Sequence, residues 1–204
     1  MISYLRNNEI DRVRWDACLM DIPAVKPYAM SWYLDIMSPG WEALVDDDYY
    51  AVFPLPRRRK FGISYVATPL FLQQLGLFTA DGDRKQMAEE FISFMPEFCR
   101  LVDLCIGQEV SLPGYRLTPK YNYELKLDEP YEKAWIGYMS DCRGNINIAR
   151  RYPQEIVGDS TPAELISLFR SYTARRAGVT RKSSYKRLSA LMEHSISSRH
   201  GMTL

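Results

Sequence analysis

The chain has 204 residues, of which 47% are hydrophobic, 13% aromatic and 25% charged, and its formal net charge is +1. This composition predicts a folded protein with a buried core and excludes an intrinsically disordered chain. No apolar run approaches the roughly 20 residues of a membrane-spanning helix and the N-terminus is too polar for a secretory signal, so we expect a cytoplasmic protein without a membrane partner.

The small net charge conceals an uneven distribution of charge along the chain. Residues 1–142 carry 15 Lys and Arg against 21 Asp and Glu, whereas residues 143–204 carry 11 against 4. The two net charges are therefore −6 and +7, and a shift of this size indicates two regions with different surroundings. We predict an N-terminal domain over residues 1–142 and a helical segment over residues 143–204.

The first region alternates between helical and extended patterns. Asn8 can cap an amphipathic helix near the start of the chain. The acidic run Asp46–Asp48 and the basic run Arg57–Lys60 are interpreted as hairpin turns between strands. A helix is predicted over residues 84–95, where apolar residues recur at helical spacing and Pro96 follows. Strands are predicted at residues 28–37, 41–45, 49–55, 62–68, 99–106 and 121–127.

The second region is almost wholly helical in pattern. A stripe of four residues, Tyr131, Trp135, Tyr138 and Cys142, predicts one helix that Asp128 can cap. Thr161 to Glu164 form a capping box with proline at the first helical position, and a last helix presents Leu188, Leu191, Met192 and Ile196. Strands followed by helices predict an α+β fold: a mixed central sheet flanked by helices, then a helical C-terminal segment.

The chemistry-bearing residue types do not form a recognisable catalytic or metal motif. The four cysteines include no C-x-x-C pair, and His194 and His200 are spaced too far apart to share a helix face. Neither a G-x-S-x-G elbow nor a complete P-loop occurs. We therefore expect no metal site, and no residue stands out as catalytic.

Residues 73–78, QQLGLF, follow a predicted strand and precede a predicted helix. They resemble the [QR]-x-x-G-x-[GA] loop with which acyl-CoA transferases of the GNAT fold bind pyrophosphate through backbone N–H groups. Gln73 and Gly76 match two positions of this loop, whereas Phe78 replaces its last small residue. Gln73, Gln74 and Gly76 are therefore the candidate contacts for acetyl-CoA or another acyl donor. The alternative is that the two glutamines only cap the loop.

Three longer blocks extend the resemblance through most of the chain: WYLDIMSPGWEALVDDDYYAVFPLP, KFGISYVATPLFLQQLGLF and YNYELKLDEPYEKAWIGYMSDCRGNI. They resemble a family of GNAT-like proteins known mainly from Bacteroidetes and related to the FemAB-type aminoacyl and peptidyl transferases. The resemblance implies a GNAT-like sheet in residues 1–142, with residues 143–204 opening a second GNAT-like domain that this chain does not complete. It also implies acyl or aminoacyl transfer to a small-molecule or peptide amine, with donor binding that needs the second domain.

Four residues are candidate substrate contacts. The side chains of Asp35 and Tyr65 can exchange a proton with an amine, Lys60 lies in the basic turn, and Arg143 lies in a basic segment that resembles relatives. The alternative, which their residue types favour, is that they have a surface or packing role.

Two further hypotheses come from other classes of protein. The first is a non-catalytic GNAT-like module that scaffolds or forms a homodimer through exposed apolar helix faces. The second is an RNA-binding protein, with tRNA as its partner, because aminoacyl-tRNA is the donor of some FemAB-type relatives. The phosphate contacts would then come from seven basic residues: Arg170, Arg175, Arg176, Arg181, Lys182, Lys186 and Arg187.

Overall fold

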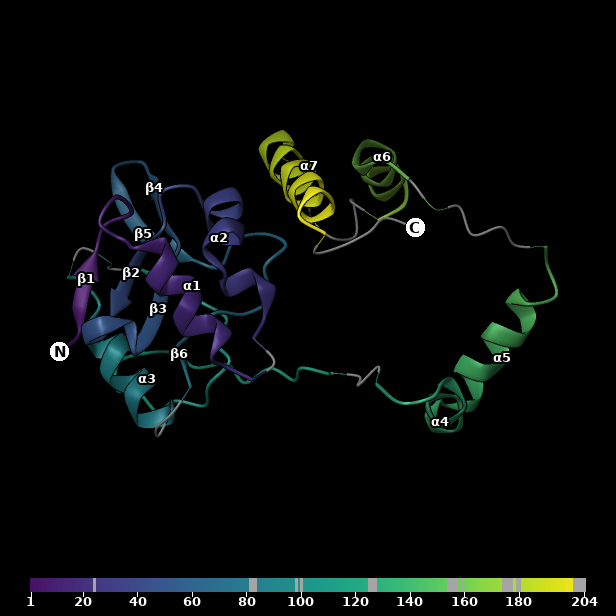
Figure 1. Ribbon diagram of the computed structural model, residues 1–204, viewed down its shortest axis with the longest axis horizontal. Helices are drawn as coiled ribbons and strands as arrows, with labels where there is room; N and C mark the ends of the chain where they lie inside the picture. The colour runs from purple at the N-terminus through teal and green to yellow at the C-terminus, as the bar shows by residue number, and fades with distance from the viewer. Residues whose placement is uncertain are drawn as a thin grey trace. The chain divides into compact units, whose positions relative to one another are not determined.

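The computed structural model describes residues 1–23, 25–80, 84–97, 99, 101–124, 128–153, 158, 160–173, 178 and 181–199 (Figure 1). These residues form an α+β fold with two small sheets and seven α-helices, which confirms the predicted class. The chain divides into a larger compact unit, residues 1–113 with 161–203, and a smaller unit, residues 114–160. The predicted domain boundary at residue 142 stays a prediction.

Helix α1 (Arg12–Met20) begins later than the Asn8 cap predicts. Its cap is Asp11, whose carboxylate accepts hydrogen bonds from the backbone N–H groups of Val13 and Arg14 at 3.0 and 3.1 Å. Because these two N–H groups have no partner within the helix, a carboxylate at this position stabilises its first turn.

The predicted strand over residues 28–37 is wrong. These residues form the 3₁₀ turn η1 (Pro27–Ala29) and helix α2 (Ser31–Met37). Asp16 accepts hydrogen bonds from the backbone N–H and the hydroxyl of Ser31, at 2.8 and 2.6 Å, which holds the start of the helix. Leu34 and Met37 are both buried at helical spacing, so packing overrides the strand propensity of the aromatic residues.

Two sheets form the larger unit. Sheet A is antiparallel and has the order β1-β2-β3-β6, whereas sheet B is mixed, because β5 pairs antiparallel with β4 and parallel with β7. The predicted strands at 41–45, 49–55 and 62–68 are confirmed as β2, β3 and β5. The bounds are β1 (Ser3–Leu5), β2 (Glu42–Val45), β3 (Ala51–Leu55), β4 (Arg57–Lys60), β5 (Ile63–Ala67), β6 (Phe78–Thr79) and β7 (Val102–Asp103), with the 3₁₀ turn η2 (Asp47–Tyr49) between β2 and β3.

The basic run Arg57–Lys60 is a strand rather than the predicted turn. Strand β4 pairs with β5 in a register that places Lys60 opposite Ile63 and leaves only Phe61 and Gly62 in the turn. Both turn residues have positive φ, 50° and 78°, which a two-residue hairpin of this kind requires. Four basic side chains therefore lie along β4, which is the edge strand of sheet B.

The later elements are shorter than predicted or divided. Among the described residues of 99–106 only β7 forms, and residues 121–124 form no strand. Residues 100 and 125–127 lie outside the described residues. The aromatic stripe from Tyr131 is split, because Tyr138 and Met139 have extended backbones. The capping box at Thr161 is confirmed, with both of its hydrogen bonds present. The helices are α3 (Arg84–Ser93), α4 (Tyr131–Gly137), α5 (Ser140–Ala149), α6 (Pro162–Tyr172) and α7 (Lys182–Ser197). None of the described helices is long and apolar enough to cross a bilayer.

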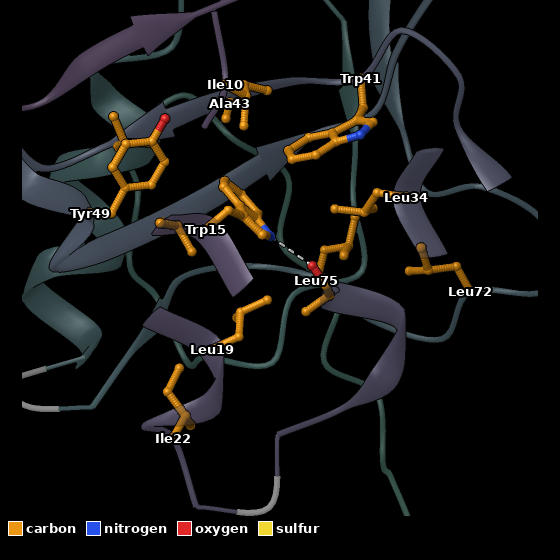
Figure 2. Packing of buried hydrophobic residues seen from close by; sticks show 13 residues of the cluster. Ile10, Trp15, Leu19, Ile22, Leu34, Trp41, Ala43, Tyr49, Leu72 and Leu75 are labelled. Atoms are coloured by element: carbon orange, nitrogen blue, oxygen red, sulfur yellow. Dashed lines mark hydrogen bonds between the residues drawn. The ribbon is translucent and has the colours of Figure 1, made fainter. Parts of the chain in front are cut away.

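The core of the larger unit centres on two tryptophans. Trp15 and Trp41 are fully buried and meet edge to face, with ring centroids 4.6 Å apart. Figure 2 shows Trp15 between Tyr49 and Trp41. The indole N–H of Trp15 donates a hydrogen bond to the carbonyl of Ala29 at 2.9 Å. A second cluster, around Phe53 and Phe91, packs α3 against sheet A.

Replacing Trp15 tests the importance of this core. We expect Trp15→Phe to lower the free energy of unfolding by about 2–4 kcal/mol, because it leaves the Ala29 carbonyl unpaired and opens a cavity. Val13→Ala on the same helix is the control, since Val13 is 80% exposed and its replacement should change stability by less than about 0.5 kcal/mol. Urea unfolding measures both, and equal effects would contradict the prediction.

Candidate functional site

The loop over residues 73–78 is hydrogen-bonded to residues 105–108. The N–H of Leu75 donates to the carbonyl of Cys105 at 2.8 Å, and the N–H of Gly107 donates to the carbonyl of Leu75 at 2.9 Å. The Gln108 amide accepts from the N–H of Leu77 at 3.1 Å and donates to its carbonyl at 2.7 Å. Two N–H groups of the loop are thus already bonded inside the protein, whereas binding a pyrophosphate requires free N–H groups.

Gly76 and the two glutamines do not surround an open space. Gly76 has a φ of +122°, and a Cβ placed on it would overlap with the Oε1 atom of Gln108. The Gln74 side chain lies beside Gly107, and Gln73 is exposed. The prediction that Gln73, Gln74 and Gly76 contact an acyl donor stays a prediction, and the structure shows Gln108 in the place where the loop would need to open.

Asp35 belongs to a network that holds α1, α2 and β2 together. Its carboxylate accepts two hydrogen bonds from the Arg12 guanidinium, at 2.8 and 2.9 Å, and one from the Trp41 indole at 2.8 Å. Partial burial opposes ionisation, but the hydrogen bonds from Arg12 and Trp41 outweigh it, and the pKa of Asp35 lies below its usual value of 3.8. These contacts account for the ionised carboxylate without a substrate.

The other predicted substrate contacts lie apart from one another. Lys60 is exposed, with its Nζ atom 5.2 Å from the centre of the Phe61 ring. Arg143 lies on α5 in the smaller unit. Tyr65 lines a cleft of the larger unit, which is described next. Among the described residues no group of His, Cys, Asp or Glu side chains is arranged to hold a metal ion, and His200 lies outside them.

The larger unit contains a cleft of about 350 Å³, which we call the arginine cleft. Its walls come from the end of α2, from the β4–β5 hairpin and from the start of α7, and no carboxylate belongs to its lining. A volume of this size lies within the usual range of small-ligand sites, about 300–1,000 Å³. The lining residues are Met37, Ser38, Pro39, Arg57, Arg58, Arg59, Tyr65, Leu70, Arg181, Ser183, Ser184 and Arg187.

The five arginines of the cleft differ in their partners. Arg57 donates to the buried Glu42 carboxylate at 2.7 Å and to the Ser64 hydroxyl at 3.1 Å, and its hydrogen bond with Glu42 raises the pKa of its guanidinium. Arg187 donates to the carbonyl of Met37 at 3.0 Å. The guanidinium groups of the remaining three, Arg58, Arg59 and Arg181, make no hydrogen bond or ion pair with any residue that the structure describes. Three cations in one cleft therefore lack a counterion from the described chain.

The N-terminus of α7 adds further positive potential to the cleft. Arg181 is the cap residue of this 16-residue helix and supplies no side-chain cap hydrogen bond, and the first turn contains no acidic residue. Ser183 and Ser184 bring two hydroxyl groups to the lining. The uncapped N–H groups and the helix dipole favour an anion at this end.

Helix α7 is held against the rest of the larger unit by a small set of contacts. The His194 ring stacks on Trp32 of α2, with centroids 4.8 Å apart. Tyr185 is buried against Phe169 of α6, which in turn meets Phe71. Figure 1 shows α7 beside α2, and these contacts place its first turn at the cleft.

The sequence identified both basic segments that line the arginine cleft, but it did not indicate that they lie next to each other. It identified the basic run Arg57–Lys60 as a turn and the residues from Arg170 to Arg187 as a candidate RNA contact. The structure brings Arg181 and Arg187 from the second set to Arg57, Arg58 and Arg59 from the first. Arg175 and Arg176 lie outside the described residues. A sequence signal existed in the two serines that open a basic helix, but nothing local connects that helix to β4.

Comparisons of the chain with models of protein families, with curated proteins and with solved structures found no match. The function is therefore inferred from the chemistry of the arginine cleft.

The contribution of Asp35 to stability should depend on pH in a defined direction. Because its pKa is lowered on folding, the stabilisation is complete above its unfolded value and is lost as the pH falls through the folded value. We expect Asp35→Asn to lower the free energy of unfolding by about 1 kcal/mol at pH 7, since both side chains of the pair are more than a third exposed. The difference should shrink below about pH 3.8. Urea unfolding at several pH values measures it, with Glu97→Gln, an exposed carboxylate, as the control. A difference independent of pH would contradict the assignment.

The contact between Gly76 and Gln108 can be isolated with a double-mutant cycle. Gly76→Ala should destabilise the protein through its positive φ and by displacing the Gln108 amide from Leu77, with a cost of about 1–3 kcal/mol for the second effect. Gly62→Ala is the control, because Gly62 also has a positive φ but open space around it. In a Gln108→Ala background the excess cost of Gly76→Ala should disappear. An unchanged cost there would show that Gln108 is not the obstacle.

Proposed function

We propose that this protein binds a phosphate-bearing ligand in the arginine cleft. The observation that carries the proposal is that Arg58, Arg59 and Arg181, without partners among the described residues, line one cleft together with the uncapped start of α7. Arginine recognises phosphate through paired N–H donors in a planar arrangement, and it stays charged at any physiological pH. A helix N-terminus favours the same class of ligand.

The reaction that we propose for this site is acyl or aminoacyl transfer of the GNAT or FemAB type to an amine. The support for it is the α+β fold with a mixed sheet, together with the long sequence blocks that resemble that family. In this proposal the cleft holds the phosphates of an acyl donor such as acetyl-CoA. Arg58, Arg59 and Arg181 bind and orient the donor, and Tyr65 is the nearest predicted proton-exchanging group in the lining.

A small ligand fits the cleft better than a nucleic-acid backbone does. Binding of RNA through phosphate contacts uses basic residues spread along an open face, whereas the unpaired arginines here converge on a concave site of about 350 Å³. The proposal therefore gives the basic start of α7 a role in binding a small molecule.

Titration of the protein with acetyl-CoA and with desulfo-CoA tests the proposal. We expect saturable binding that weakens with salt, and we expect Arg58→Ala, Arg59→Ala and Arg181→Ala each to weaken it at least tenfold, since a charge-assisted hydrogen bond contributes about 1.5–3 kcal/mol. Arg6→Ala is the matched control, because Arg6 is exposed and lies outside the cleft.

Three results would contradict the proposal. One is the absence of heat at millimolar ligand, and another is an equal loss of affinity with Arg6→Ala. The third is a loss on Gln73→Ala with no effect of the arginine variants, which would place the donor on the loop of residues 73–78. Lys60→Ala shows in the same titration whether the predicted contact at Lys60 takes part. A titration with tRNA under the same salt conditions tests the RNA hypothesis. If that hypothesis holds, tRNA binds more tightly than either CoA compound.

A further inference from the structure

We infer that the ligand of the arginine cleft carries two phosphoryl groups, which bridge the β4 wall to α7 and so fix α7 on the larger unit. This inference rests on the proposed binding of a phosphate-bearing ligand at that site. It adds the chemical class of the ligand and a consequence of binding for the position of a helix.

The charge of the cleft favours a ligand with more than one phosphoryl group. Five arginines line it, and among the described residues only Arg57 is paired with a carboxylate, that of Glu42. Four positive charges therefore remain in the walls. One phosphoryl group carries about −1.5 to −2 charges at neutral pH, so a single group leaves about half of this charge without compensation. Two linked phosphoryl groups carry more negative charge than one and therefore compensate a larger part of the positive charge in the walls.

The unpaired arginines are divided between two walls. Arg58 and Arg59 belong to strand β4, whereas Arg181 precedes the first turn of α7. A ligand with one phosphoryl group can satisfy the β4 wall alone. A ligand with two can bind Arg58 and Arg59 with one group and Arg181 and the N–H groups of α7 with the other. Because the unpaired arginines lie on two walls, the first phosphoryl group binds the β4 wall and the second contacts α7.

Helix α7 is docked by few contacts, so a ligand can change its docking measurably. Only Tyr185 and Leu191 of its 16 residues are buried, and the hydrogen bond from Arg187 to the carbonyl of Met37 joins its first half to the end of α2. A bridging anion adds attractive contacts to both walls at once, so it favours the docked arrangement of α7.

The size of the expected change in the opening of α7 follows from the ligand concentration relative to Kd. A ligand that binds only the docked arrangement lowers the population of the open one by the factor 1 + [L]/Kd. At about 100 times Kd, the opening of α7 should therefore fall about 100-fold. A ligand that binds the β4 wall alone has the same affinity for both arrangements and leaves the opening of α7 unchanged.

Hydrogen exchange of the α7 amides, residues 182–197, in the full chain tests the inference. The probes are inorganic pyrophosphate and inorganic phosphate, each at saturation according to a parallel titration. We expect pyrophosphate to slow exchange of α7 up to about 100-fold and phosphate to bind without slowing it. Arg181→Ala should abolish the slowing by pyrophosphate. Lys186→Ala is the matched control on the same helix, since Lys186 lies outside the lining, and it should leave the slowing intact.

The possible failures are distinguishable. Binding of pyrophosphate with no change in α7 exchange overturns the bridge but leaves the proposed function standing. Equal protection by saturating phosphate overturns the requirement for two phosphoryl groups. Protection that persists in Arg181→Ala overturns the contact with α7. The absence of binding by either anion overturns both this inference and the proposed binding of a phosphate-bearing ligand.

Discussion

The hydrogen bond from Arg187 to the carbonyl of Met37 joins α7 to the end of α2 across 150 positions of sequence, and the arginine cleft depends on it. The last carbonyls of a helix lack intrahelical partners and form the negative end of its dipole, so a guanidinium there is favoured both as a donor and as a charge. The stacking of His194 on Trp32 and the burial of Tyr185 against Phe169 support the same docking. Without α7 in this position, the basic side chains of β4 would lie along an open sheet edge rather than in a cleft.

The carboxylates near the cleft are bonded to groups that build the fold. Asp35 accepts hydrogen bonds from Arg12 and Trp41 in the network that ties α2 to the tryptophan core. Glu42 pairs with Arg57 on the inner side of β4. Both carboxylates thus neutralise arginines that hold structure, and none belongs to the lining of the cleft. An anionic ligand is the group that would complete the charge balance there.

Two places in this chain have features of a phosphate site, and they differ in what they offer. In the loop of residues 73–78, the N–H groups of Leu75 and Leu77 are bonded to residues 105–108, and Gln108 fills the space beside Gly76. In the arginine cleft, three guanidinium groups have no partner among the described residues, and the cap residue of α7 supplies no side-chain hydrogen bond. The free energy of binding an anion is more favourable where no existing hydrogen bond must be broken first. We therefore propose the cleft, rather than the loop, as the site of the phosphates.

Patterns of neighbouring residues were enough to predict the α+β class, strands β2, β3 and β5, helix α3 and the capping box of α6. The excess of basic residues near the C-terminus is likewise visible in the sequence. The helix over residues 31–37 depends instead on contacts with other segments, because Asp16 bonds Ser31 and the rest of the larger unit buries Leu34 and Met37. The same holds for the site: which arginines lack a counterion, and which of them meet, is set by the docking of α7 on α2. No local pattern encodes that docking, because its contacts join residues that are far apart in the chain.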